Sequence, residues 1–350
     1  MDRLLHWMTL TRIINEAKSP NNFLMRLLYG NAVTVPTRHI MLSYLVRGRK
    51  MAGFVKRDGA AILVDGGNEH EIPVTPTHIR NKRVMSPSDL LNKRRAGTRV
   101  FASKQDMQSA QRAYLAREMK YQLDDAMNTE EWLAAQSLRA KVSYTSVDEA
   151  SFEITIPRPA AHDFSLATTA EAWETATASP KDLFLRVMEL INDAVSLNVT
   201  DVILGREAAD AFCKIPEVAA KLDTRRFVTG TLDLTTQFQE DGALFLGAPF
   251  HNIRVWRYGR KVEMPDGTVE DLIRPKYAEF VCATQAAEFT AYYGAIEDFD
   301  AAPPGSLLES KRFMKSKDEW DPSAKIMLME TNPLMIPRRP DSTASVQVVS

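Results

Sequence analysis

Residues 104–139 read KQDMQSAQRAYLAREMKYQLDDAMNTEEWLAAQSLR, and neither glycine nor proline interrupts them. Ser103 precedes the run as an N-cap residue, whose hydroxyl accepts a hydrogen bond from an amide of the first turn. The apolar positions that fall near one face are Leu115, Met119, Leu123, Ala126 and Leu133. This pattern predicts one helix of about 35 residues, roughly 50 Å long at 1.5 Å per residue, where the usual helix has about 11–12.

A helix of this length favours a plate-like domain in which the helix lies along a small sheet. Strands are expected directly after it, at residues 141–145 and 151–157. The remaining helix faces are charged, and their residues are Arg112, Lys120, Asp124, Glu130 and Glu131. We interpret the acidic pairs among them as solvated charges on an exposed face and not as a catalytic acid and base.

The first 38 residues are typical of an extended arm. They contain a short apolar run at residues 23–29, which ends at Gly30 and Asn31, residues that favour a helix stop. A helix this short is marginal in water. We therefore expect its apolar face to be buried against another surface.

Residues 39–87 change to a strand pattern, in which Ile40, Leu42, Tyr44 and Val46 alternate with polar or smaller residues. Residues 61–64 and 70–74 flank Gly66 and Gly67, which predicts a hairpin. The segment has too few large apolar residues for a core of its own. It is also strongly basic, through Lys50, Lys56, Arg57, Arg80, Lys82 and Arg83. A two-stranded excursion of this kind needs a neighbouring surface to lie on.

The stretch from about 166 to 300 is expected to form a compact α+β domain. Ser179 and Pro180 predict the start of a helix that runs to residue 197. The further predicted helices are 206–213 and 216–222, and the predicted strands are 200–205, 253–256 and 277–282, with a hairpin turn at 265–268. The tail is predicted to return to strands at 324–330, 334–336 and 345–349, which rejoin the earlier sheet.

Composition is that of a folded chain, with 45% hydrophobic and 25% charged residues over 350 positions. No run of about 18 apolar residues exists, so no membrane-spanning helix is predicted. The two cysteines, Cys213 and Cys282, have apolar neighbours and are interpreted as reduced, buried thiols.

The charge is distributed unevenly along the chain. Residues 1–100 hold 17 Lys and Arg against 7 Asp and Glu, and the other 250 hold 27 against 38. The two parts are therefore expected to attract each other, within one subunit or between subunits. Binding of nucleic acid by the basic part is the alternative hypothesis.

The sequence carries none of the common motifs for enzyme chemistry. No glycine pattern matches a phosphate-binding loop or a dinucleotide turn, and no serine has the spacing of a nucleophile elbow. The six histidines are scattered, and His70-Glu71 lacks the second histidine of the zinc-protease helix. We therefore predict no catalytic residue, no cofactor and no metal site, and a chain that is not an enzyme.

The order of these parts resembles the Hong Kong 97 capsid fold, and the sequence is similar to the phage lambda-type major head (capsid) proteins. The resemblance extends over nearly the whole chain. The stretches that carry it are residues 23–28, 74–76 with 82–87, 221–226 (Lys-Leu-Asp-Thr-Arg-Arg), 293–298 (Tyr-Gly-Ala-Ile-Glu-Asp) and 332–336 (Asn-Pro-Leu-Met-Ile). Residues 140–250 are the most diverged.

The resemblance implies an α+β major capsid fold with five parts. These are an N-terminal arm (1–38), an extended β loop (39–87), a peripheral domain with the spine helix (88–165), an axial domain (166–300) and a return to the peripheral domain (301–350). The arm and the extended loop are then expected to lie over neighbouring subunits. The expected assembly contacts are Phe23, Leu24, Leu27, Leu28, Lys50, Lys56, Arg57, Arg80, Arg83, Lys221, Arg225 and Arg226.

The same resemblance implies a virion protein that assembles in the host cytoplasm. Copies of the chain are expected to form the hexamers and pentamers of an icosahedral head. Its expected partners are a scaffolding protein, a portal protein, a decoration protein and packaged double-stranded DNA, with no membrane partner. Two alternatives stay open: an encapsulin-type shell that encloses protein, and a nucleic-acid-binding protein that uses the basic first third.

Overall fold

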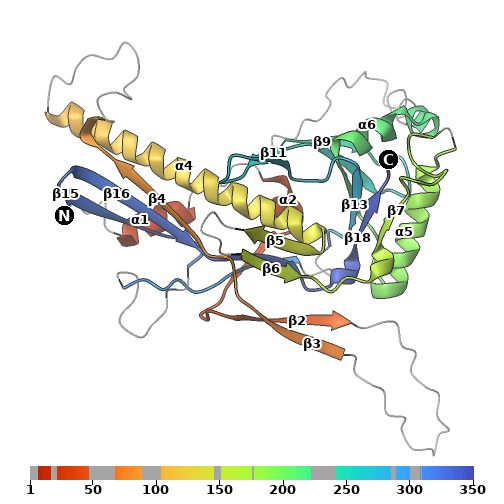
Figure 1. Cartoon of the computed structure of the whole chain (residues 1–350), viewed down its shortest axis with the longest axis horizontal. Helices are drawn as coiled ribbons and strands as arrows, with labels where there is room; N and C mark the ends of the chain where they lie inside the picture. The colour runs from red at the N-terminus through yellow and green to blue at the C-terminus, as the bar shows by residue number, and fades with distance from the viewer. Residues whose placement is uncertain are drawn as a thin grey trace, which may run out of the picture.

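The computed structural model describes ten stretches of the chain (Figure 1). They are residues 7–16, 22–46, 68–88, 104–145, 151–175, 177–221, 242–284, 289–299, 308 and 310–350. The long helix α4 and a small sheet lie at one side of the molecule, and a larger sheet with helices α5 and α6 lies at the other. A two-stranded ribbon extends away from both.

Helix α4 (Lys104–Leu138) has 35 residues and confirms the predicted spine. It packs on a three-stranded antiparallel sheet of order β15-β16-β4. The strands are β4 (Ile79–Met85), β15 (Phe313–Trp320) and β16 (Ser323–Thr331). Leu123 and Ala126 of the predicted apolar face are buried in one cluster with Met327 and Met329 of the sheet. Methionines suit this place because their flexible side chains fill irregular gaps.

Helix α1 (Trp7–Glu16) covers the edge of this sheet. Thr11 Oγ1 donates to the carbonyl of Met314 at 3.3 Å and accepts from its amide at 3.1 Å. Asn15 Nδ2 donates to the carbonyl of Arg312 at 3.0 Å. These bonds satisfy backbone groups of β15 that would otherwise be open for pairing with another chain. Leu10 and Ile14 are buried beneath the helix.

The larger sheet has six strands in the order β7-β18-β13-β8-β10-β9. Its strands are β7 (Asp163–Ser165), β8 (Asp201–Leu204), β9 (Ala243–Gly247), β10 (Arg254–Tyr258), β13 (Tyr277–Val281) and β18 (Thr343–Gln347). Helices α5 (Pro180–Val195) and α6 (Arg206–Lys214) pack on it. The start signal of α5 is confirmed, because Ser179 Oγ accepts from the amide of Asp182 at 3.5 Å. The predicted compact α+β body is formed around these elements.

The last strand differs from the prediction for residues 301–350. β15 and β16 pair with β4 beside the spine helix, whereas β18 pairs with β13 and β7 in the six-stranded sheet. The cause is local, because Ala344 and Val346 are both buried in the core beneath α5. The chain therefore ends in the six-stranded sheet and not in the peripheral part.

Several small elements join the two sides. A three-stranded sheet of order β1-β14-β17 connects the arm to the last third of the chain. The remaining elements here are α2 (Phe23–Leu27), β1 (Asn31–Thr34), β5 (Lys141–Thr145), β6 (Ser151–Thr155), β11 (Lys261–Glu263), β12 (Val269–Asp271), β14 (Phe289–Tyr293) and β17 (Pro333–Pro337), with short 3-10 turns η2 (Ala160–His162) and η4 (Pro340–Ser342). A single buried cluster includes residues of α2, the end of α4, β14 and β17.

The ribbon consists of β2 (Ile40–Val46) and β3 (Asn68–Val74), paired antiparallel from Ile40↔Val74 to Val46↔Asn68. The predicted strands at its two ends are confirmed. The predicted hairpin arm at 61–64 and its turn lie outside the described residues. Ile40 and Val74 at the base are buried, whereas Met41 is exposed. Figure 1 shows the ribbon leaving the body below the two sheets.

The two thiols differ from the expectation of a buried pair. Cys282 is buried and donates to the carbonyl of Asn198 at 2.9 Å, and burial raises its pKa. Cys213 is exposed, because it lies on the outer face of α6, whose inner face carries Ala208, Ala209 and Phe212.

The aromatic cluster in the core of the six-stranded body leads to a first prediction. Phe184 is fully buried, and its ring contacts those of Phe212, Phe250 and Phe280. Phe184→Ala is expected to lower the free energy of unfolding by about 3–5 kcal/mol, because it leaves a cavity among these rings. Chemical denaturation measures the effect. The exposed Val269→Ala serves as control and should stay within about 0.5 kcal/mol of wild type.

Candidate assembly elements

A buried carboxylate joins the arm to the body. Glu131 of α4 has no exposed surface. Its Oε1 accepts from the amide of Leu24 at 2.8 Å and from the hydroxyl of Tyr258 at 2.7 Å, and its Oε2 accepts from the amide of Met25 at 3.0 Å. The amides at the start of a helix lack partners inside the helix, and a carboxylate is favoured there. One side chain thus binds α2, the spine helix and β10 together.

The surroundings reinforce this junction. Asn22 Nδ2 donates to the carbonyl of Met127 at 2.6 Å. Arg260 donates to Asn22 Oδ1 at 3.3 Å and to Asn128 Oδ1 at 2.7 Å. The ring of Phe23 lies 5.1 Å from that of Trp256, measured between centroids. Polar and aromatic contacts therefore fix the same short helix.

The protonation of this cluster follows from burial. Burial raises the pKa of Glu131, while the two amides, Tyr258 and Arg260 act in the opposite direction. Burial also raises the pKa of Tyr258 far above its ordinary value, and the neighbouring Glu131 adds to the effect. Tyr258 therefore keeps its proton and remains the donor to Glu131.

Two expectations are corrected at this place. Glu131 was expected on a solvated face, and it is buried because α2 needs an acceptor for its amides. Phe23, Leu24 and Leu28 were expected to contact another subunit, and all three are buried within their own chain. Leu27 is partly buried against the same cluster. The face of α2 is thus satisfied by α4 and β10 of the same molecule.

Glu130, the preceding residue, is also buried, again contrary to expectation. Arg312 Nη2 donates to both of its oxygens, at 2.8 and 2.7 Å. This buried ion pair connects the spine helix to the chain just before β15. Burial, with Glu130 nearby, raises the pKa of Tyr293. Consecutive residues of α4 therefore hold two different segments of the chain.

The basic strand β4 is paired with acidic residues of the same chain. Arg83 Nη1 donates to Glu118 at 3.0 Å, and its Nη2 donates to Asp125 at 3.0 Å. Arg80 lies 3.5 Å from Glu330 and 3.9 Å from Asp298. The predicted attraction between basic and acidic parts thus operates within one subunit for these two arginines.

The root of the β2–β3 ribbon is held by several contacts. Thr77 Oγ1 donates to the carbonyl of Pro333 at 2.7 Å, and His78 Nδ1 hydrogen-bonds Asn332 Oδ1 at 2.8 Å. Pro76 packs on Gly294, where a Cβ atom would come within 2.8 Å of the proline Cγ. Glycine is needed at residue 294 because of this close approach. The ribbon therefore leaves the body from a fixed base.

The other predicted contacts divide into two groups. Lys221 is exposed, with its Nζ 4.0 Å from the centroid of Phe250 and 3.9 Å from Glu217. The remaining five lie outside the described residues and are Lys50, Lys56, Arg57, Arg225 and Arg226.

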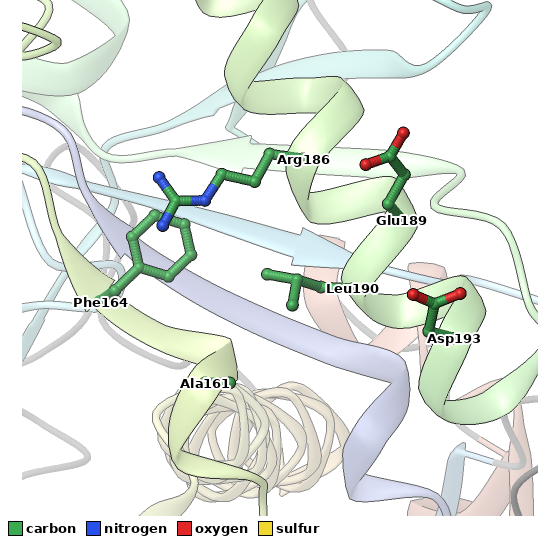
Figure 2. A pocket seen from close by; sticks show the side chains of 6 residues that line it. All are labelled: Ala161, Phe164, Arg186, Glu189, Leu190 and Asp193. Carbon is green, nitrogen blue, oxygen red and sulfur yellow. The ribbon is translucent and has the colours of Figure 1, made fainter.

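A shallow groove lies between α5 and the segment around β7 (Figure 2). It is lined by Ala161, Phe164, Arg186, Glu189, Leu190 and Asp193. Arg186 lies over the ring of Phe164, 4.7 Å from its centroid, and 3.8 Å from Glu171. The groove holds no histidine, cysteine or serine that would supply a nucleophile or base beside its two carboxylates.

The next two features concern metal ligands and membrane-spanning helices in the described part of the chain. Among those residues, no three His, Cys, Asp or Glu side chains gather as a metal ion requires. None of the helices in those stretches has the length and apolarity that a membrane crossing needs.

The spine helix on a small sheet, the separate six-stranded body and the extended ribbon define a class of protein, the phage capsid proteins with the Hong Kong 97 fold. The model of the family "Phage major capsid protein E" matches residues 6–348. The chain therefore belongs to this family, which confirms the resemblance noted in the sequence. By its description, this family consists of structural proteins of the phage capsid. No curated protein matches the chain significantly.

Solved structures share the fold at low sequence identity. The crystal structure described as a capsid protein of a prophage from E. coli CFT073 has a TM-score of 0.73 at 17% identity, with 99% of each chain covered. A phage-related protein from Bordetella bronchiseptica RB50 has a TM-score of 0.54 at 12% identity, covering 97% of this chain and 95% of that one. The mature capsid of bacteriophage PhiM1 has a TM-score of 0.50 at 11% identity, covering 95% and 88%.

The Glu131 junction leads to a second prediction. Glu131→Gln replaces one of the two acceptor oxygens with an NH₂ group that faces a donor, so one buried amide of α2 loses its partner. The free energy of unfolding is expected to fall by about 2–4 kcal/mol, measured by chemical denaturation. Glu153→Gln is the matched control, because Glu153 is exposed and pairs only with Lys141 at 3.0 Å. Equal stabilities of the two variants would contradict the role given to Glu131.

The root of the ribbon leads to a third prediction. Gly294→Ala places a methyl group against Pro76 and is expected to destabilise the chain by about 1–3 kcal/mol. Hydrogen exchange should show faster exchange at residues 75–78 than in wild type. Gly30→Ala is the control, since a Cβ at Gly30 meets nothing within 4 Å. Unchanged exchange at 75–78 would argue against close packing at this root.

Proposed function

We propose that this chain is the major capsid protein of a tailed double-stranded DNA phage and that it self-assembles into the hexamers and pentamers of an icosahedral head. The head encloses the genome. Membership of the capsid protein family and the capsid fold support this proposal.

The β2–β3 ribbon is the observation that carries the proposal. Ile40 and Val74 at its base are buried, whereas Met41, one residue beyond Ile40, is 57% exposed. A two-stranded ribbon is marginally stable in water without a third strand or another surface. A neighbouring copy supplies that surface in a closed shell, where every subunit gives a ribbon and receives one.

The charge of the excursion supports the same contact. Arg80 and Arg83 are matched by carboxylates of their own chain. The contacts proposed between subunits therefore rest on Lys50, Lys56 and Arg57, against the acidic part of a neighbour. Lys221, Arg225 and Arg226 are proposed to lie at the centre of the capsomer or on the lumen.

The division of the chain into parts remains a proposal of the same kind. It comprises arm, extended loop, peripheral domain and axial domain. The last 50 residues divide between the peripheral sheet and the six-stranded sheet, according to the strand pairing above. Partners proposed are a scaffolding protein, a portal protein, a decoration protein and non-specifically bound DNA, with assembly in the host cytoplasm before the chain becomes part of the virion.

An encapsulin-type shell is the alternative in which the same fold encloses protein. Analysis of the contents of purified particles separates the two, because a phage head protects double-stranded DNA from nuclease. Particles that hold protein cargo and no DNA would favour the alternative.

The excursion provides the fourth prediction. Residues 47–67 are replaced by Asn-Gly, which joins the paired ends Val46 and Asn68 through a two-residue hairpin turn. The shortened chain is expected to keep the unfolding midpoint of wild type and to form no closed shells. Electron microscopy and sedimentation velocity measure assembly.

A charge variant serves as the companion experiment. Lys50→Gln, Lys56→Gln and Arg57→Gln together keep the length of the excursion and remove three of its positive charges. Assembly is expected to weaken and to lose part of its dependence on salt. Closed shells from the shortened chain, at the concentration where wild type assembles, would refute the role of the excursion.

A further inference from the structure

The turn of the β15–β16 hairpin carries an exposed tryptophan. Trp320 is the last residue of β15, and 91% of its surface is exposed. The strand is buried at its start and exposed over its last four residues, so this end of the hairpin projects from the body. Figure 1 shows the hairpin ending at the side of the molecule farthest from α5. Tryptophan is among the residues most enriched at the energetic centres of interfaces.

The same sheet has an open face. Met85, Met327 and Met329 point to the buried side, in one cluster with residues of α4. The alternate residues point the other way, because side chains alternate along a strand. Val84 is 56% exposed there, and its cross-strand neighbour Ile326 is partly exposed.

Lysines surround these apolar side chains. In register, Val84 lies beside Ile326, and Ile326 lies beside Lys317. The next row on the same face holds Lys82 and Leu328. Lys82 and Lys317 are exposed. The open face is therefore apolar at its centre, with Lys82 and Lys317 beside the apolar residues and Glu319 nearer the turn.

The turn has the complementary character. Glu319 and Asp321 flank Trp320, and both are exposed. Asp318, which is also exposed, lies 3.1 Å from Lys325 of the same hairpin. An aromatic side chain between two carboxylates matches an apolar face edged by lysines, and such matching gives specificity to an interface.

We propose that Trp320 anchors a contact between copies of this chain, in which the hairpin turn of one copy binds the open face around Val84 and Ile326 of the next. The inference rests on the proposed function, since it names one of the contacts that holds the shell together. The contact is heterologous, with different surfaces on its two sides, and such contacts form rings where the rotation between copies closes.

The distance between the hairpin turn and the open face limits how two copies can lie relative to each other. Ser323 at the turn and Ile326 on the face are three residues apart along β16, which is roughly 10 Å at about 3.3 Å per residue. Copies that exchange this contact therefore have their hairpin turns side by side. The ends of the peripheral sheets meet there, away from the six-stranded bodies.

Substitution tests the anchor. Trp320→Ala is expected to raise the protein concentration needed for shell assembly at least about tenfold, because truncation of an interface tryptophan commonly costs that much. Trp320→Phe should recover part of the loss. The unfolding midpoint should not change, since the side chain is exposed. Val269→Ala, on the exposed β11–β12 hairpin, is the matched control and should assemble as wild type does.

Cross-linking tests the partner surface. In a Cys213→Ser background, Trp320→Cys and Val84→Cys chains are mixed, assembled and oxidised. A disulfide-linked dimer of the two variants is expected on a non-reducing gel. Trp320→Cys mixed with Val269→Cys should give none. Because Trp320→Cys also removes the indole ring, the chains are mixed at a concentration above the one that Trp320→Ala needs for assembly, and the cross-link then reports which residues meet.

The outcomes separate the inference from the proposed function. A wild-type chain that forms no shells would count against the proposed function itself. Shells that form equally well with Trp320→Ala would overturn this inference alone. An assembly defect without the Trp320–Val84 cross-link would mean that Trp320 binds another partner, such as a decoration protein or DNA, and would also overturn the contact between copies.

Discussion

The Glu131 carboxylate is the contact on which the arrangement of the chain depends. A buried carboxylate is costly unless donors surround it, and here three donors come from two parts of the sequence, both far from α4 along the chain. Two are the amides that open α2, and the third is the hydroxyl of Tyr258. Burial of the Glu131 carboxylate therefore constrains the fold, because α4 cannot pack in its position unless α2 and β10 supply the donors. Glu130 imposes the same condition on the segment before β15 through Arg312.

This constraint explains why the body is rigid at the point where the ribbon leaves it. The spine helix fixes the small sheet, and β4 of that sheet continues directly from the ribbon through residues 75–78. Thr77 and the Pro76–Gly294 contact hold this connection to β17 and to the end of β14. For the contact proposed with a neighbouring copy, a fixed base sets the direction in which the ribbon leaves the body. A shell built from many copies requires that property.

Sequence patterns predicted the elements better than their surroundings. The uninterrupted run at 104–138, the Ser179-Pro180 start and the alternating strands all report local geometry, and the structure confirms them. Burial of Glu130 and Glu131, and burial of α2 within its own chain, were not predicted, because they depend on partners more than 100 residues away, and no local pattern reports these. The pattern of apolar and charged residues on α4 had instead predicted that Glu130 and Glu131 lie on a solvated face. The exposure of Cys213 was missed for a related reason, since apolar neighbours in sequence lie on a different face of α6.

These corrections change which surfaces remain for assembly. The arm helix and the arginines of β4 had been expected to meet neighbours, and both find their partners within the chain. The surfaces that we propose for assembly are therefore fewer than charge and hydrophobicity along the sequence suggest. They are the β2–β3 ribbon and the open sheet face near the exposed Trp320. Glu130 and Glu131, two buried carboxylates of α4, find their partners within the subunit. Under the proposed function, the surfaces that stay open then decide where copies meet, a selectivity that non-directional attraction between basic and acidic parts would not give.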